Sequence, residues 1–195
     1  MSNNIMIVGV GGQGTLLASR ILGNAALAQG YDVKVSEVHG MSQRGGSVVT
    51  YVKYGETAVS SPVICRGEAD VIIAFEQLEA LRWLPYLRRG GKIFVSTERI
   101  NPMPVITGAA AYPENIPDIL RKAGADITVV DAVSLAVAAG TNKAQNVVMI
   151  GAYASQSAAA KDIYIAALKQ SVPAKILDVN LKAFELGYEG AQTHV

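Results

Sequence analysis

The residues of this sequence that are best suited to chemistry lie near its beginning, in Gly9-Val10-Gly11-Gly12-Gln13-Gly14. They follow the apolar run Ile5–Val8 and precede Thr15–Leu22, in which the leucines and the isoleucine recur at helical spacing. A strand, a glycine-rich turn and a helix in this order are typical of a phosphate-binding α/β unit. Gly9 and Gly11 would let the backbone approach a phosphate, Gly14 would let the helix pack on the strand, and the helix N-terminus would attract the anion. The alternative is a purely structural turn.

Glu37 is the next candidate, because it lies near the end of a predicted second strand, Asp32–Val38. In a nicotinamide-binding unit, an acidic residue about 20 residues beyond the last glycine binds the ribose hydroxyls. The alternatives are a strand-end carboxylate paired with Arg44 or Lys34, or one that accepts hydrogen bonds from the glycine loop. We favour these structural roles, since a glycine-rich loop containing Arg44 follows directly.

The segment His39–Ser47 is rich in glycine and poor in apolar residues, which predicts a loop on the ligand side of the sheet. Arg44 among these glycines could clamp a phosphate or carboxylate, or form an ion pair with Glu37 or with a partner chain. His39 titrates near neutrality and could act as a general acid or base. No cysteine, second nearby histidine or serine–aspartate pair completes a catalytic set, so a hydrogen-bonding or stacking role is favoured.

Two further side chains have mainly structural interpretations. Glu76 follows the run Asp70–Phe75, at the carboxyl end of a predicted central strand where open α/β sheets bind ligands. A favourable charge at a helix N-terminus is the preferred role for it. Cys65 is predicted to be a small buried apolar residue. Because it is the only cysteine, the chain cannot form an internal disulfide or hold an iron–sulfur cluster on four thiolates of its own.

The fold that must position these residues is predicted to be α/β and Rossmann-like, with a mostly parallel sheet and helices on both faces. The first helix is expected to run to about Ala28, and the second strand to be parallel to the first. Ser47–Tyr54 is predicted to turn back toward Ala58–Pro62 as an inserted β-hairpin. The other predicted elements are strands at 70–75, 92–97 and 126–130, helices at 76–88 and 113–123, and a helical C-terminal part over 134–190. Gly90-Gly91 is expected to end the helix at 76–88.

Length and composition narrow the class of protein. The 195 residues contain no repeat or linker and fit a single domain over 1–195. Half of the residues are hydrophobic and 17% are charged, which predicts extensive burial, part of it against a partner. The net charge of +1, without a long basic run, gives no reason to expect a nucleic acid partner. No leader and no apolar run of about 18 residues is present, so we expect no membrane insertion and a cytoplasmic location.

Two of these motifs together resemble one family. The glycine turn and Ser36-Glu37-Val38-His39-Gly40-Met41-Ser42-Gln43-Arg44-Gly45-Gly46-Ser47-Val48 resemble the gamma-type domain of 2-oxoacid:ferredoxin oxidoreductases. The His-Gly-Met and Gln-Arg-Gly-Gly form of the loop is most similar to the smaller, beta subunit of the indolepyruvate ferredoxin oxidoreductases. Further similarity lies in Ser61-Pro62, Ala69-Asp70, Ala74–Leu81 and Asn146–Ala152, so that the resemblance extends over about four-fifths of the chain.

The resemblance implies a subunit and not a complete enzyme. In this family an aryl 2-oxoacid such as indolepyruvate reacts with coenzyme A to give an acyl-CoA and carbon dioxide, and the electrons pass to ferredoxin. The resemblance implies that thiamine diphosphate, magnesium and iron–sulfur clusters reside in a larger partner subunit. This chain would then hold no cofactor alone, contain no catalytic residue or metal ligand, and be inactive when isolated.

The gamma-type domain in this family packs on the thiamine-binding domains and is associated with coenzyme A, the co-substrate. The resemblance therefore places a phosphate or the partner at one group of residues, formed by Gly11, Gly12, Gln13, Gly14 and Thr15 with His39, Ser42, Gln43, Arg44, Gly45 and Gly46 opposite. Together with Glu37, these are the candidate cofactor-binding residues. Two other functions use the same motifs: a free-standing nicotinamide-dependent dehydrogenase, and a nucleotide- or coenzyme-A-binding module outside any catalytic complex.

Overall fold

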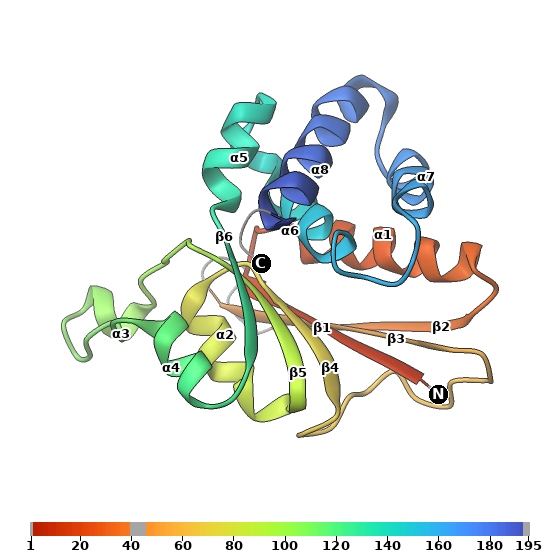
Figure 1. Cartoon of the computed structure of the whole chain (residues 1–195). Coiled ribbons are helices and arrows are strands. Elements are labelled where there is room, and N and C mark those ends of the chain that lie inside the picture. The colour runs from red at the N-terminus through yellow and green to blue at the C-terminus, as the bar shows by residue number, and fades with distance from the viewer. Residues whose placement is uncertain (1, 40–45, 193–195) are drawn as a thin grey trace.

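The computed structural model describes residues 2–39 and 46–192. Its strands are β1 (Ser2–Val10), β2 (Asp32–His39), β3 (Ser47–Gly55), β4 (Ala69–Ala74), β5 (Leu87–Ser96) and β6 (Asp126–Val130). They form one sheet with the order β2-β3-β1-β4-β5-β6 (Figure 1). The pairs β1–β4, β4–β5 and β5–β6 are parallel, whereas β3 is antiparallel to both of its neighbours. The prediction of a mostly parallel α/β sheet is therefore confirmed.

The helices lie on both faces of the sheet (Figure 1). They are α1 (Thr15–Ala28), α2 (Gln77–Trp83), α3 (Met103–Ile106), α4 (Ile116–Lys122), α5 (Ala132–Ala139), α6 (Gln145–Ala154), α7 (Lys161–Ser171) and α8 (Leu177–Gln192), with short 3-10 turns η1 (Leu84–Tyr86), η2 (Asn142–Ala144) and η3 (Ala174–Ile176). In the described chain, no helix is both long and apolar enough to cross a bilayer.

Two cores follow from the alternation of side chains along the central strands. Ile5 and Ile7 of β1 belong to the core that α1 and α5–α8 cover, and Met6 and Val8 belong to the core on the other face, with α2 and α4. All four side chains are at most 1% exposed. Burial on both faces explains why these strands read as continuous apolar runs in the sequence.

The predicted hairpin over Ser47–Pro62 is wrong. β3 does not pair with Ala58–Pro62 but lies between β2 and β1; it pairs with β1 along its whole length and with β2 from Val48 to Gly55. Both of its hydrogen-bonding edges are thus occupied, and no ladder remains for the following segment. That segment is attached instead by Val59 N, which donates to Asp32 Oδ2 at 2.7 Å. β2 runs in the direction of β1, as predicted, but β3 separates the two strands.

The helix predicted at 76–88 is shorter than expected. It ends at Trp83, and Pro85 lies in the 3-10 turn that follows, because proline cannot donate the hydrogen bond that would continue a helix. Gly90-Gly91 consequently lies inside β5 and does not end the helix. The helix predicted from Pro113 begins at Ile116 and ends before Gly124, whose φ is +85°.

The alanine-rich C-terminal helices pack on each other, as their small side chains predict. A Cβ at Gly151 of α6 would lie 2.1 Å from Phe184 O, and one at Gly187 of α8 would lie 2.0 Å from Val148 O. Each helix therefore uses a glycine to bring its backbone against the other. This packing covers one face of the sheet beside α1 (Figure 1).

Candidate functional site

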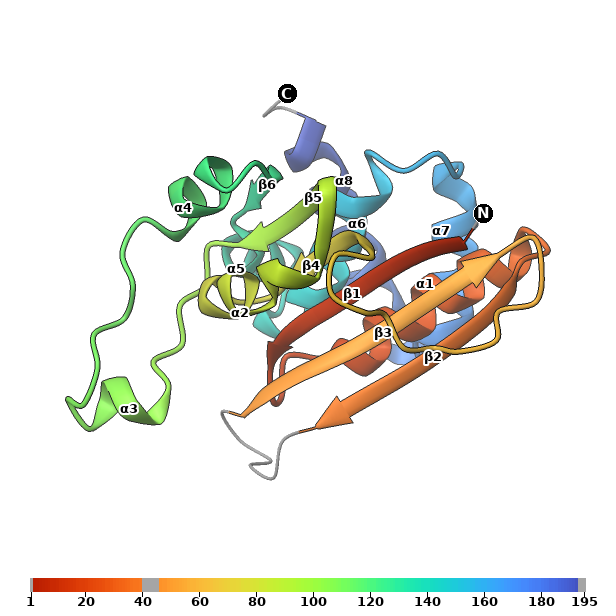
Figure 2. The ribbon, with the colours of Figure 1, turned by 90° about the horizontal axis from the view of Figure 1, so that it is seen from below.

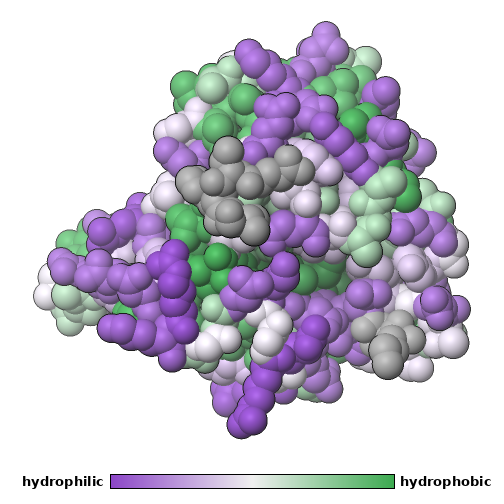
Figure 3. Space-filling model, in the orientation of Figure 1, coloured by the Kyte–Doolittle hydropathy of each residue, from purple (hydrophilic) through white to green (hydrophobic). Residues whose placement is uncertain are grey.

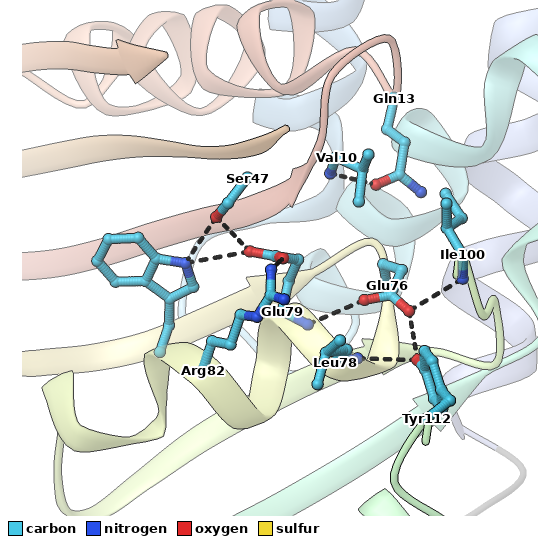
Figure 4. A network of polar contacts seen from close by, with 10 residues as sticks. Val10, Gln13, Ser47, Glu76, Leu78, Glu79, Arg82, Ile100 and Tyr112 are labelled. Carbon is cyan, nitrogen blue, oxygen red and sulfur yellow. Dashed lines mark hydrogen bonds and ion pairs between the residues drawn. The ribbon is translucent and has the colours of Figure 1, made fainter. Parts of the chain in front are cut away.

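The glycine turn joins β1 to α1 at the carboxyl end of the parallel strands, and the side chain of Gln13 fills it. Gln13 is 7% exposed. Its Oε1 accepts a hydrogen bond from Val10 N at 2.7 Å (Figure 4), and its Nε2 donates to Phe75 O at 3.0 Å and to Glu98 Oε2 at 2.8 Å. Gln13 thereby links the turn to the segments that follow β4 and β5.

The glycines of the turn serve this arrangement in ways that differ from the expectation. A Cβ at Gly9 would lie 2.8 Å from Gln13 Oε1, so Gly9 makes room for that side chain. A Cβ at Gly14 would lie 2.5 Å from Asn146 Nδ2, so Gly14 allows contact with α6. The prediction had been that Gly14 allows the helix to pack on the strand. Gly12 has a φ of +100° and open space around it, and its left-handed backbone is the reason for glycine there.

A hollow of about 370 Å³ adjoins the turn and is lined by Gly12, Gln13, Gly14, Asn142, Lys143 and Gln145. Gly14 is the N-cap of α1, and no side chain caps the helix there. The first amides of α1, the positive end of its dipole and the ammonium of Lys143 can together attract an anion. The hollow thus has the chemistry of a phosphate or carboxylate site.

The second motif meets the first at Gly46, whose carbonyl oxygen accepts a hydrogen bond from Gly11 N at 3.0 Å. Ser42, Gln43, Arg44 and Gly45 lie outside the described residues, and of His39 only the backbone is described. The structure therefore brings together the glycine turn and the end of the 39–47 segment.

Glu37 contacts hydroxyl groups inside the protein. Its Oε2 accepts hydrogen bonds from Thr15 Oγ1 at 3.2 Å and from Thr50 Oγ1 at 2.8 Å. Lys34, one of the partners considered from the sequence, instead pairs with Asp32 at 3.1 Å. Glu37 thus links β2, β3 and the first residue of α1, and a ribose would have to compete with these hydroxyls.

Glu76, at 1% exposure, caps α2, as predicted from its position at a helix start. Its carboxylate accepts from Glu79 N at 2.9 Å, from Ile100 N at 3.1 Å and from the hydroxyl of Tyr112 (Figure 4). Burial, followed by the hydrogen bond to Glu76, raises the pKa of Tyr112, so its phenol stays protonated and donates.

A second buried carboxylate, Glu79, lies next to this group at 2% exposure. It accepts hydrogen bonds from the hydroxyl of Ser47 and from Trp83 Nε1 at 3.3 Å, and it pairs with Arg82 at 2.7 Å (Figure 4). Ser47 is the first residue of β3, so this contact attaches the start of β3 to α2. Both carboxylates are fully engaged in holding elements together.

Sequence reasoning missed Glu98, Lys143 and Asn146 as neighbours of the turn. Burial raises the pKa of Glu98, and the charge of Glu76 adds to this, while hydrogen bonds from Gln13 and Gln145 act in the opposite direction. The position of Glu98 just after β5 was the available signal, since parallel strands bring their carboxyl ends to one edge. No local pattern marks the other two residues.

Cys65 is exposed, so the prediction of a buried cysteine is wrong. It lies in the connection between β3 and β4, outside both cores. Within the ranges 2–39 and 46–192, no group of three or more His, Cys, Asp and Glu residues could hold a metal ion.

A family model described as "Pyruvate ferredoxin/flavodoxin oxidoreductase" matches residues 4–190. The chain belongs to this family. The resemblance drawn from the two glycine-rich motifs is therefore confirmed.

Similar family members include proteins named "Indolepyruvate oxidoreductase subunit IorB". The one from Thermococcus kodakarensis is 44% identical over 194 residues, which is 97% of this chain and 96% of the relative. The one from Pyrococcus horikoshii is 44% identical over 198 residues, with the same coverage. A "2-oxoglutarate synthase subunit KorC" from Methanothermobacter thermautotrophicus is 28% identical, over 95% of this chain and 93% of that relative.

Solved structures of the family share the fold. The gamma subunit of a keto/oxoacid ferredoxin oxidoreductase from Geobacter sulfurreducens has a TM-score of 0.75 at 22% identity, over 99% of this chain and 98% of that one. The 2-oxoglutarate:ferredoxin oxidoreductase from Magnetococcus marinus also has a TM-score of 0.75, at 18% identity. The match covers 98% of this chain but 31% of that longer chain, so the same fold is there one part of a larger polypeptide.

Proposed function

We propose that this chain is the smaller subunit of an indolepyruvate-type 2-oxoacid:ferredoxin oxidoreductase, as a single gamma-type domain over 1–195. The observation that carries the proposal is the 44% identity, over nearly the full length of both chains, to relatives named as an indolepyruvate oxidoreductase subunit. The complete enzyme would oxidise an aryl 2-oxoacid in the presence of coenzyme A and pass the electrons to ferredoxin.

In this proposal the redox chemistry belongs to a larger subunit. A four-thiolate iron–sulfur cluster needs more cysteines than the one in this sequence, so clusters would be held by the partner, with thiamine diphosphate and magnesium. The Magnetococcus marinus chain supports such an arrangement, since there the equivalent fold is joined to a much longer polypeptide. The contribution of this chain would be binding and positioning, in a cytoplasmic complex.

We propose that this contribution is made at the edge of the sheet where the glycine turn lies. The hollow beside Gly12 and Gly14 suits one anionic group, such as a phosphate of coenzyme A, with Lys143 as the nearby cation. Gln13 and Glu37 would act by holding the turn and the strands in position, because both side chains already bond within the chain. The other candidates remain proposed as neighbours of the same group or of the partner; they are Gly11, Thr15, His39, Ser42, Gln43, Arg44, Gly45 and Gly46.

The first experiment is to tag this chain in its native host and identify the proteins that purify with it. We expect a larger subunit that carries thiamine diphosphate and iron, and a complex that reduces ferredoxin with indolepyruvate and coenzyme A. The isolated chain should be inactive in the same assay. A lone homo-oligomer, or turnover by the isolated chain, would show that the proposal is wrong.

The hollow can be tested in the purified complex by Lys143→Gln. Losing one cation beside a bound anion should raise the KM for coenzyme A by roughly tenfold while the KM for indolepyruvate stays unchanged. Lys169→Gln, which removes a charge from α7 away from the hollow, is the matched control. A nicotinamide-dependent dehydrogenase is not favoured, since Glu37 is already bonded to two threonine hydroxyls.

A further inference from the structure

The chain between β5 and α4 forms an arm that extends away from the body of the fold, with α3 at its far end (Figure 2). Figure 1 shows the same arm from the side, at the left of the molecule. From Ile100 to Pro113 the sequence contains no charged residue, whereas Arg99 and Glu114 stand at its two ends. The arm, defined as residues 99–114, therefore carries charged side chains only at its two end positions and none between them.

Both ends of the arm are attached to one buried carboxylate. Glu76 accepts a hydrogen bond from Ile100 N at 3.1 Å at the beginning of the arm and from the hydroxyl of Tyr112 near its end (Figure 4). The oxygen of Tyr112 also accepts from Leu78 N at 3.1 Å, and the guanidinium of Arg99 lies 4.5 Å from the centre of the Tyr112 ring. The arm is thus anchored before it meets any partner, which lowers the entropy cost of binding.

The tip of the arm exposes apolar side chains. Met103 and Ile106 are 65% and 64% exposed, more than any other large hydrophobic residue in the described chain. Being three residues apart in α3, they lie on one side of it, while Val105 packs back against the core. In Figure 3 hydrophobic atoms are visible at the centre of this face, in its upper part where Figure 1 places α5 and α8, and at the left-hand tip where Figure 1 places α3. An anchored segment that holds two large apolar side chains in water is typical of a docking element.

We propose that the arm docks, through Met103 and Ile106, into an uncharged apolar hollow on the larger subunit. This inference rests on the proposed function and adds the surface through which the two subunits meet. Two observations favour the larger subunit as the occupant. Glu98, directly before the arm, accepts a hydrogen bond from Gln13 of the glycine turn at 2.8 Å, so the arm leaves the sheet beside the candidate site. In the Magnetococcus marinus enzyme, moreover, the equivalent fold shares its chain with the remainder of the protein.

The test uses the full-length chain and the larger subunit that purifies with it. The double variant Met103→Glu/Ile106→Glu places two charges in the proposed hollow and should weaken binding about 100-fold, measured by titrating the larger subunit with the chain. Val63→Glu and Val137→Glu change side chains that are 51% and 59% exposed outside the arm, and each should bind within about threefold of wild type. Circular dichroism melts of all variants check that the fold is kept.

The outcomes separate the two proposals. If the wild-type chain purifies with no larger subunit, the proposed function fails. If the wild-type chain binds the larger subunit and the double variant binds equally well, the function stands and the arm is not the docking element. If the double variant only abolishes self-association of the isolated chain, the arm is a contact between two copies and the inference is wrong. Should the double variant melt early, a photo-crosslinking residue at Ile106 replaces it, and the absence of an adduct with the larger subunit overturns the proposal.

Discussion

Replacing Gln13 with alanine should destabilise the isolated chain, although the residue lies in a motif associated with ligand binding. The substitution removes the acceptor of Val10 N and the donor to Phe75 O, both buried, and the donor to Glu98. A buried backbone group without a partner costs about 1–3 kcal/mol, and Glu98 is accessible enough for water to replace the lost bond. The two backbone groups therefore predict a loss of about 3 kcal/mol in the free energy of unfolding.

Urea unfolding of the wild type and of Gln13→Ala measures this directly. For a domain of this size, about 3 kcal/mol corresponds to a melting temperature lower by roughly 6–12 °C, with an unchanged dependence on urea concentration. The isosteric variant Gln13→Glu separates hydrogen bonding from packing. It keeps an oxygen for Val10 N but places a carboxylate oxygen against Phe75 O and Glu98, which should be at least as destabilising at neutral pH.

The pH dependence of Gln13→Glu supplies an additional check. Burial and the neighbouring oxygens raise the pKa of the introduced carboxyl group in the folded state, so the folded protein binds its proton more tightly than the unfolded chain does. The variant should therefore regain stability relative to wild type as the pH falls, because a protonated carboxyl can donate again. A loss below about 1 kcal/mol for Gln13→Ala would show that Gln13 does not hold the turn together.

Three further predictions concern the surroundings of the turn and the helical packing. Gly14→Ala should lower the free energy of unfolding by about 2–3 kcal/mol, because a φ of +82° disfavours alanine and its Cβ would reach Asn146. Gly12→Ala is strained but has open space around it, and should lower it by only about 1–2 kcal/mol. Equal losses in thermal melts would contradict this difference. Because the folded-state pKa of Glu98 is raised, the wild type should lose stability as the pH rises from about 4.5 through that pKa. Glu98→Gln should not share this loss in denaturation series from about pH 4 to about pH 8. If the free energies of unfolding of the two proteins depend on pH in the same way, the prediction is wrong. Gly151→Ala should lower the free energy of unfolding by about 3 kcal/mol in urea, because its Cβ would lie 2.1 Å from a backbone oxygen of α8. The loss is expected despite the better helix propensity of alanine. A stabilising result would mean that α6 and α8 can move apart.

Where interactions are local, the sequence alone was sufficient. β1, the glycine turn and α1 were predicted in the right place, because an apolar run, glycines and helical spacing follow one another within 28 residues; α1 has its predicted bounds, whereas β1 extends beyond the predicted Ile5–Val8 to Ser2–Val10. β4 and β6 were predicted for the same reason. The family was also accessible from the sequence, since both of its motifs are continuous segments, at Gly9–Gly14 and Ser36–Val48.

The pairing of β3 and the surroundings of the turn were decided by tertiary structure. The position of β3 between β2 and β1 depends on a ladder with Ser2–Val10, whose paired residues are 37 to 53 positions apart, and no local pattern encodes such a partner. Asn146, which lies against Gly14, is separated from it by 132 residues. Exposure of Cys65 likewise depends on which elements fail to cover it. The sequence determines which residues can approach a ligand or form a strand, and the packing of distant elements decides which of them do so, because burial and hydrogen-bond partners are properties of the assembled chain.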